Sequence, residues 1–87
     1  MLTVAKLTIL IKYHWDLRRF HKQSTPQEQA LVADVDWYAT AELLEDLRLY
    51  HKNLVSKEYA RRTHATLLSI CADEETTQTF IGYASTL

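Results

Sequence analysis

An 87-residue chain with a net charge of −1 and a single cysteine has room for one domain, residues 1–87, and for no internal disulfide. Because no covalent link replaces a large core, the burial of apolar side chains must supply the stability. The small net charge argues against a bulk electrostatic grip on nucleic acid or on anionic lipid.

The charged residues alternate in sign in four consecutive blocks. Residues 1–23 carry a charge of +4, residues 24–46 carry −6, residues 47–64 carry +4 and residues 65–87 carry −3. Blocks of opposite sign suit antiparallel neighbours that attract one another, within one chain or between copies of it. The alternative is that the blocks are solvated helix faces, because exposed ion pairs contribute little to stability.

The apolar run of residues 7–11 is bracketed by Lys6 and Lys12, and no small-residue cleavage site follows it. The run is therefore interpreted neither as a signal peptide nor as a membrane span. We expect a cytoplasmic protein that makes no contact with a membrane.

Glycine and proline occur once each, whereas a β-rich domain of this length would need several tight turns. The sequence therefore predicts an all-α fold, a small bundle of three to four helices with a long second helix. The first helix runs from Leu2 to about Lys22, with one apolar stripe through Val4, Leu7, Ile11 and Trp15. Residues 7–15 also alternate with period two, so the alternative is an α+β fold with an N-terminal strand paired between subunits.

The second helix begins with the strongest local signal in the chain. Thr25 is placed to cap it, Pro26 occupies the first helical position and Glu28 is placed to return a hydrogen bond to the cap. Helical periodicity continues to about Asn53. Asp36 projects toward the main apolar stripe of this helix, where a buried carboxylate would need a donor. Further helices are predicted after the capping residues Ser56 and Asp73.

An unbroken second helix over 26–53 would be about 42 Å long, and it is apolar on two sides. A single copy of so small a domain leaves part of that surface uncovered. We therefore expect a homo-oligomer, with a dimer favoured. The residues expected at the oligomer interface are Leu31, Val35, Tyr38, Leu49, Val4, Leu7 and Ile11.

The residue spacing offers little for catalysis or for metal binding. His14 and His21 are seven residues apart on one predicted helix, too far for one ion, and the same holds for Cys71 and His64 as a nucleophile and its base. Cys71 is interpreted as a core thiol. Three acidic residues of the second helix, Glu42, Glu45 and Asp46, are interpreted as a solvated face. We expect no enzyme activity, no metal and no cofactor.

The most suggestive constellation lies at the end of the first predicted helix. Trp15, Arg18 and Lys22 share one face there, so a base could stack on the indole while the cations meet phosphates. The alternative is that Trp15 belongs to the core. The residues expected at an anionic-ligand site are Trp15, Arg18, Arg19, Lys22, Arg61 and Arg62.

These observations predict a non-enzymatic helical interaction protein, a regulator, adaptor or inhibitor that acts through a protein partner. The alternative is a binder of a phosphate-bearing ligand, such as a nucleotide or nucleic acid, held at a basic and aromatic junction between subunits.

Overall fold

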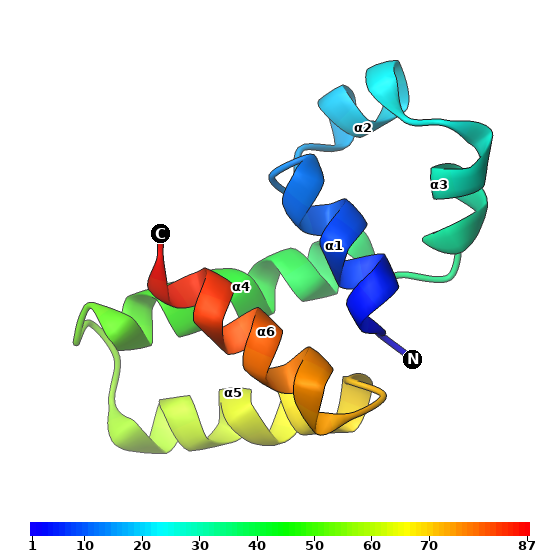
Figure 1. Ribbon diagram of the computed structural model, residues 1–87. Helices are drawn as coiled ribbons and strands as arrows, with labels where there is room; N and C mark the ends of the chain where they lie inside the picture. The colour runs from blue at the N-terminus through cyan, green and yellow to red at the C-terminus, as the bar shows by residue number, and fades with distance from the viewer.

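The computed structural model describes residues 1–87 and contains six helices and no strand (Figure 1). The helices are α1 (Val4–Lys12), α2 (Leu17–Gln23), α3 (Pro26–Leu31), α4 (Trp37–His51), α5 (Lys57–Ile70) and α6 (Glu74–Ser85). The prediction of an all-α fold is confirmed. The alternative with an N-terminal strand is wrong, because the segment that alternates with period two forms α1.

The last helix, α6, lies at the centre of the molecule. It contacts α1, α4 and α5, and α4 also packs against α5, while α2 and α3 lie beyond α1 at one end (Figure 1). Phe80 of α6 and Leu7 and Leu10 of α1 have no exposed surface. The chain is nevertheless elongated, with extents of 40 × 23 × 18 Å.

The first residues of the chain are tied to the connection between α5 and α6. The N–H of Leu2 donates to the Ile70 carbonyl at 2.8 Å, and the Ala72 N–H donates to the Leu2 carbonyl at 2.7 Å, which makes an isolated parallel bridge. These two bonds place the start of α1 beside the end of α5.

Three of the predicted helix starts are confirmed. Thr25 Oγ1 accepts the Glu28 N–H at 3.1 Å while Glu28 Oε1 accepts the Thr25 N–H at 2.9 Å, so the reciprocal cap of α3 is complete. Ser56 and Asp73 cap α5 and α6 through their side-chain oxygens. Each of these caps satisfies backbone donors that have no partner within the helix.

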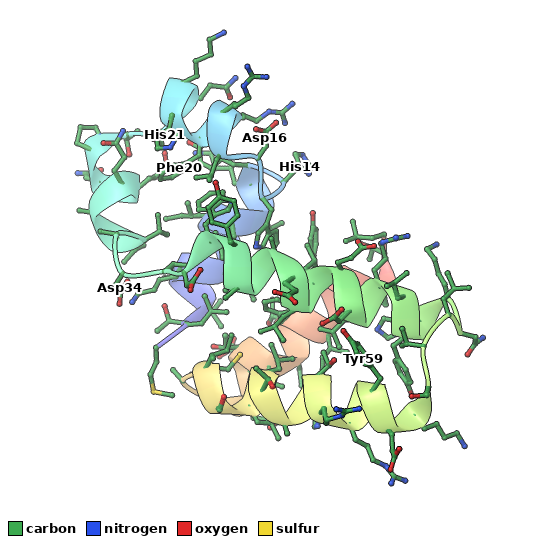
Figure 2. The ribbon with its side chains drawn as sticks, turned by 180° about the vertical axis from the view of Figure 1, so that it is seen from behind. His14, Asp16, Phe20, His21, Asp34 and Tyr59 are labelled. Atoms are coloured by element: carbon green, nitrogen blue, oxygen red, sulfur yellow. The ribbon has the colours of Figure 1, made fainter.

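The helix predicted from Leu2 to about Lys22 is broken at residues 13–16. His14 and Trp15 have φ values of 53° and 56°, in the left-handed region, which ends α1. Asp16 then caps α2, because its side chain accepts the N–H groups of Arg18 and Arg19. His14 and Asp16 lie together at this reversal between the two helices (Figure 2).

The long second helix predicted over 26–53 is also broken, so the bundle has six helices rather than three or four. α3 ends at Leu31, and Asp36 caps α4 by accepting the Ala39 N–H at 3.0 Å. The carboxylate of Asp36, which the pattern placed on an apolar stripe, is exposed and does not need a buried donor. Both long predicted helices therefore break where an aspartate starts the next helix.

The left-handed backbone of His14 and Trp15 is held in place by the packing of the Trp15 side chain. Its ring stacks on Tyr83 with centroids 5.5 Å apart and meets the edge of Phe80 at 5.7 Å. Its Nε1–H donates to Thr40 Oγ1 at 3.2 Å, and its carbonyl accepts the Trp37 Nε1–H at 2.9 Å. A left-handed residue other than glycine costs roughly 1 to 2 kcal/mol, which these contacts offset.

Two ion pairs join the first basic block of the sequence to the first acidic block. Lys6 pairs with Asp34 at 2.8 Å, and Lys12 pairs with Glu28 at 2.8 Å. Attraction between these blocks therefore acts within one chain, where it holds α1 against α3 and against the turn that follows α3.

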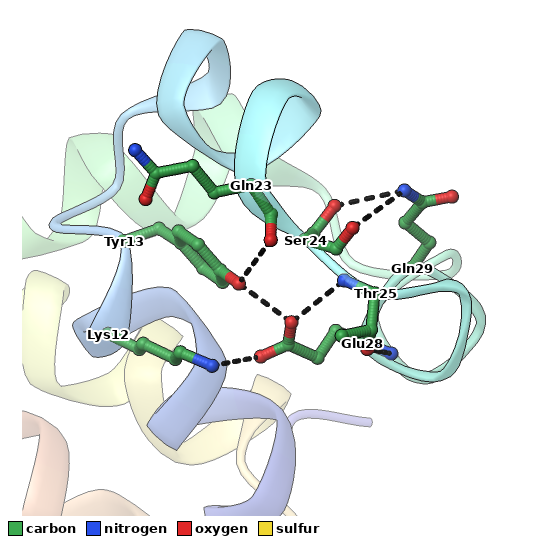
Figure 3. Close-up of polar contacts among 7 residues, drawn as sticks. All are labelled: Lys12, Tyr13, Gln23, Ser24, Thr25, Glu28 and Gln29. Carbon is green, nitrogen blue, oxygen red and sulfur yellow. Dashed lines mark hydrogen bonds and ion pairs between the residues drawn. The ribbon is translucent and has the colours of Figure 1, made fainter.

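Glu28 is the centre of a small polar network between α1 and α3 (Figure 3). Besides Lys12 and the Thr25 N–H, it binds the hydroxyl of Tyr13, which donates to Glu28 Oε1 at 2.7 Å. The Lys12 ammonium, then the Tyr13 hydroxyl and the Thr25 N–H, lower the pKa of Glu28 to about 2. The carboxylate is therefore bound in its charged form.

Candidate functional site

A groove of about 610 Å³ lies between α4 and α5. Its lining side chains come from residues 1–2, 34–36, 39–46 and 59–70, and none comes from α6, which lies behind α4 and α5 in Figure 2. We call it the acidic groove, for the charges that line it. Its volume falls within the range of about 300 to 1,000 Å³ that is usual for binding sites.

The bottom of the acidic groove is apolar. Leu2, Val35, Leu43 and Ile70 contribute to it, and all four belong to the hydrophobic core or pack against it. A ligand that fills the groove would therefore remove apolar surface from water, at about 25 cal/mol for each Å² buried.

Four carboxylates line the acidic groove, and they differ in their partners. Asp34 is paired with Lys6, and Asp36 caps α4. Glu42 has no hydrogen-bond or ion-pair partner within the chain, and Asp46 has no cationic partner. Arg62 is the only lysine or arginine in the lining, so the lining side chains carry an excess of negative charge.

One hydrogen bond crosses from α5 to α4 at the acidic groove. The hydroxyl of Tyr59 donates to Asp46 Oδ1 at 3.0 Å, and Tyr59 lies between the two helices in Figure 2. The Asp46 carboxylate, by accepting this bond and by its charge, raises the pKa of the Tyr59 phenol. This hydrogen bond keeps the Asp46 carboxylate at the acidic groove and occupies only one of its two oxygen atoms.

A second, smaller pocket of about 340 Å³ has the opposite charge. It lies where the end of α4, the first half of α5 and Ile81 of α6 meet, and no carboxylate lines it. We call it the basic pocket. Its polar side chains are those of Tyr50, His51, Lys57, Arg61 and His64.

The predicted anionic-ligand residues do not converge within one chain. Arg18, Arg19 and Lys22 are exposed on α2, which lies at the opposite end of the molecule from α5 in both Figure 1 and Figure 2. Trp15 is half-buried against α6 and so belongs to the packing of the chain.

The two adjacent arginines of that prediction are also separated from each other. Arg61 lines the basic pocket, whereas Arg62 lines the acidic groove. Consecutive residues of a helix point about 100° apart, so a neighbouring pair need not share a face. Of the residues predicted for this site, only Arg61 lies in the basic pocket.

The residues predicted at an oligomer interface fall into three groups. Leu7 has no exposed surface, so this assignment is wrong, because its own chain covers it. Leu31 is 41% and Tyr38 78% exposed. The half-buried members are Val4, Ile11, Val35 and Leu49.

Cys71 and His64 lie in different surroundings. The thiol of Cys71 is buried, and this burial raises its pKa, whereas His64 is exposed at the basic pocket. No three histidine, cysteine, aspartate or glutamate side chains gather at one point where they would hold a metal ion. None of the helices combines the length and the apolar character that crossing a membrane requires.

The acidic groove was missed by sequence reasoning, although part of its signal was present. Glu42 and Asp46 are one helical turn apart, and they were interpreted as a solvated face because no second element was known to converge on them. The turn between α4 and α5 brings Tyr59 to Asp46, and that pairing depends on tertiary structure. The basic pocket was missed for the same reason.

Comparison with protein-family models, with curated proteins and with solved structures finds no match for this chain.

Proposed function

We propose that this chain is a non-enzymatic interaction protein that binds a basic, amphipathic segment of a protein partner in the acidic groove. The observation that carries the proposal is the combination of an apolar floor with the carboxylates of Glu42 and Asp46, neither of which forms an ion pair within the chain. A segment with leucine-like residues on one side and lysine or arginine beside them complements both features.

The shape of the acidic groove favours a helical or extended segment over a compact surface. Two roughly side-by-side helices form its walls, and this arrangement accepts the side chains of a third helix laid between them. The proposal is therefore that the chain occludes or displays the basic segment of its partner, as a regulator, adaptor or inhibitor does.

Binding is tested with two helical peptides that share the same leucine positions and carry lysine in one case and glutamate in the other. We expect the lysine peptide to bind saturably in isothermal titration calorimetry, and more weakly as salt is raised. The glutamate peptide should bind at least about tenfold more weakly, a difference of about 1.4 kcal/mol. Equal affinities for the two peptides would contradict the proposal.

Isosteric substitutions test whether the lysine peptide binds in the acidic groove. The double variant Glu42→Gln, Asp46→Asn removes two charges while leaving an oxygen for the Tyr59 hydroxyl, and should weaken lysine-peptide binding about tenfold. Glu75→Gln is the matched control, because Glu75 is exposed at the start of α6 and lines neither cavity. If the control weakens binding as much as the double variant does, the groove is not the site.

A homodimer remains part of the proposal, supported by the exposure of Leu31 and Tyr38. Light scattering should give a mass near twice the 10.2 kDa of one chain, and Tyr38→Glu should reduce it toward that of a monomer. A monomeric mass at high protein concentration would remove the dimer from the account. A cytoplasmic location accords with a buried, unpaired cysteine.

A further inference from the structure

The basic pocket combines four nitrogen-bearing side chains with an apolar base. Lys57, Arg61 and His64 follow one another at i, i+4 and i+7 on α5, so they share one face of that helix, and His51 faces them from the end of α4. The base of the pocket is formed by Leu47, Ala60 and Ile81.

None of these basic side chains forms an ion pair or a side-chain hydrogen bond that would stabilise the fold. The ion pairs of the chain involve Lys6, Lys12 and Arg48, and no side chain of the basic pocket takes part in a side-chain hydrogen bond or an ion pair. Glu58 is next to Lys57 in sequence, but it forms no ion pair and does not line the pocket. The pocket is therefore a concave surface with positive charge and no carboxylate to compensate it.

The aromatic ring of Tyr50 lies beside the basic side chains of the pocket. Tyr50 is 43% exposed, and its ring lies 5.6 Å from that of His51 at an interplanar angle of 59°. A ring with a free surface next to cations suits a ligand that carries both a planar group and a negative charge. The guanidinium of Arg61 can bind two oxygens of a phosphate at once, which a lysine cannot do.

We propose that the basic pocket binds a small organic phosphate with a planar ring, of the chemical class of a mononucleotide. The phosphate lies between Arg61, Lys57 and the two histidines, and the ring packs against Tyr50. A volume of about 340 Å³ is at the small end of the range for ligand sites, so it suits one such unit. This site goes beyond the proposed partner groove, with which it shares no lining residue.

The same geometry disfavours a nucleic-acid strand. A strand requires a continuous basic track, and the other basic cluster of the chain, Arg18, Arg19 and Lys22, lies on α2 at the opposite end of the molecule (Figure 1). The basic side chains of the pocket are exposed, so water and salt screen them. We therefore expect a dissociation constant for a mononucleotide of about 10 µM to 1 mM.

The test is a titration of the full chain with three probes, which are adenosine monophosphate, inorganic phosphate and adenosine, followed by NMR chemical shifts. We expect saturable shifts with the nucleotide, weaker binding of inorganic phosphate, and the weakest binding or none with adenosine. No saturable shift with the nucleotide up to about 10 mM would overturn the proposal. Tighter binding of a single-stranded oligonucleotide that is lost in Arg18→Gln would also overturn it.

Matched arginine variants locate the site. Arg61→Gln should weaken nucleotide binding about tenfold, whereas Arg62→Gln, one residue later on the other face of α5, should leave it unchanged. Arg61→Lys keeps the charge but loses the bidentate hydrogen bonding of the guanidinium, so the affinity of this variant for the nucleotide should lie between those of the natural chain and Arg61→Gln. Equal losses in Arg61→Gln and Arg62→Gln would contradict the assignment.

Tyr50→Leu tests the packing of the ligand ring separately from the binding of its phosphate. The variant should lose the preference for the nucleotide over inorganic phosphate while retaining the binding of inorganic phosphate itself. An unchanged preference would exclude Tyr50 as the surface on which the ring packs. Because Tyr50 is exposed, its loss should leave the fold intact.

Discussion

The charges of α1 and α3 are used differently from those of α4 and α5. Lys6 and Lys12 reach across from α1 to carboxylates in and just after α3, so those charges hold two segments together. Between α4 and α5 no ion pair forms, and the only pair on α4 joins Glu45 to Arg48 within the helix. Most of the opposite charges there lie on different surfaces: the carboxylates of Glu42 and Asp46 line the acidic groove, which contains one cationic side chain, Arg62, and Arg61 lines the basic pocket, which contains no carboxylate.

This comparison separates charges that stabilise the chain from charges that are free to meet a ligand. Neutralising Glu28, which is paired between α1 and α3, should affect folding, whereas neutralising Glu42, which lines the acidic groove without a partner, should affect binding alone. Variants of these two residues that change stability and binding separately sharpen the comparison, and variants of either that change both together break it.

The largest expected effect on stability is that of Trp15→Ala. Because the indole packs against Tyr83 and Phe80, its loss should lower the free energy of unfolding by about 3 kcal/mol, as measured by urea denaturation. Leu54→Ala is the control, since that side chain is 67% exposed and its loss should change stability by less than about 0.5 kcal/mol. A Trp15→Ala variant that is as stable as the natural chain but no longer binds the nucleotide would support the prediction that Trp15 belongs to the ligand site.

A smaller effect is expected at Asp36, where two roles are separable. Asp36→Ala removes the cap of α4 and should cost about 1 kcal/mol of stability, whereas Asp36→Asn retains a capping oxygen and should cost little. Both variants remove a charge from the acidic groove, so both should weaken binding of the lysine peptide. Urea denaturation and calorimetry on the same samples distinguish the roles, and equal stabilities of the two variants would refute the capping assignment.

The pH dependence of stability provides the next contrast. The pKa of Glu28 is lowered from 4.5 to about 2, so its contribution is complete above pH 4.5 and is lost as the pH falls toward 2. In Glu28→Gln the urea midpoint should therefore fall less between pH 6 and pH 3 than in the natural chain. An equal fall of the midpoint in Glu28→Gln and in the natural chain would break the comparison.

The smallest expected effect is a stabilisation. His14 is exposed and has a left-handed φ of 53°, so glycine relieves strain there without removing a buried contact. His14→Gly should raise the free energy of unfolding by about 0.5 kcal/mol, because the greater freedom of glycine in the unfolded chain offsets part of the gain. A clear loss of stability would show that His14 makes a contact that its exposure conceals.

The helix starts that the sequence predicted are those with a polar capping residue at the boundary of a predicted helix. Thr25, Ser56 and Asp73 are these residues, and each caps as expected. Asp16 and Asp36 also cap helices, but each lies within a run of apolar residues at helical spacing and was interpreted as part of a continuing helix. The tertiary contacts of Trp15 and Trp37 favour the breaks, and local pattern does not contain those contacts.

The candidate sites were less predictable than the fold because each depends on residues from several elements. Arg61 was predicted to bind an anionic ligand, but its neighbours in the pocket, Tyr50 and His51, come from the end of another helix. At the groove, Asp46 and Tyr59 meet only because the connection after α4 reverses the chain. Charge sign along the sequence predicted attraction between blocks, and it could not show which side chains remain unpaired.

The central claim is that opposite charges on two surfaces of the α4–α5 pair serve two separate ligands. The most direct test is one NMR experiment in which the lysine peptide and adenosine monophosphate are added in turn to the same labelled chain. The account predicts that the peptide shifts the amides around residues 39–46 and 66–70, that the nucleotide shifts those around residues 50–51, 57, 61 and 64, and that the two ligands do not compete. Displacement of one ligand by the other, with both shifting the same amides, would contradict it.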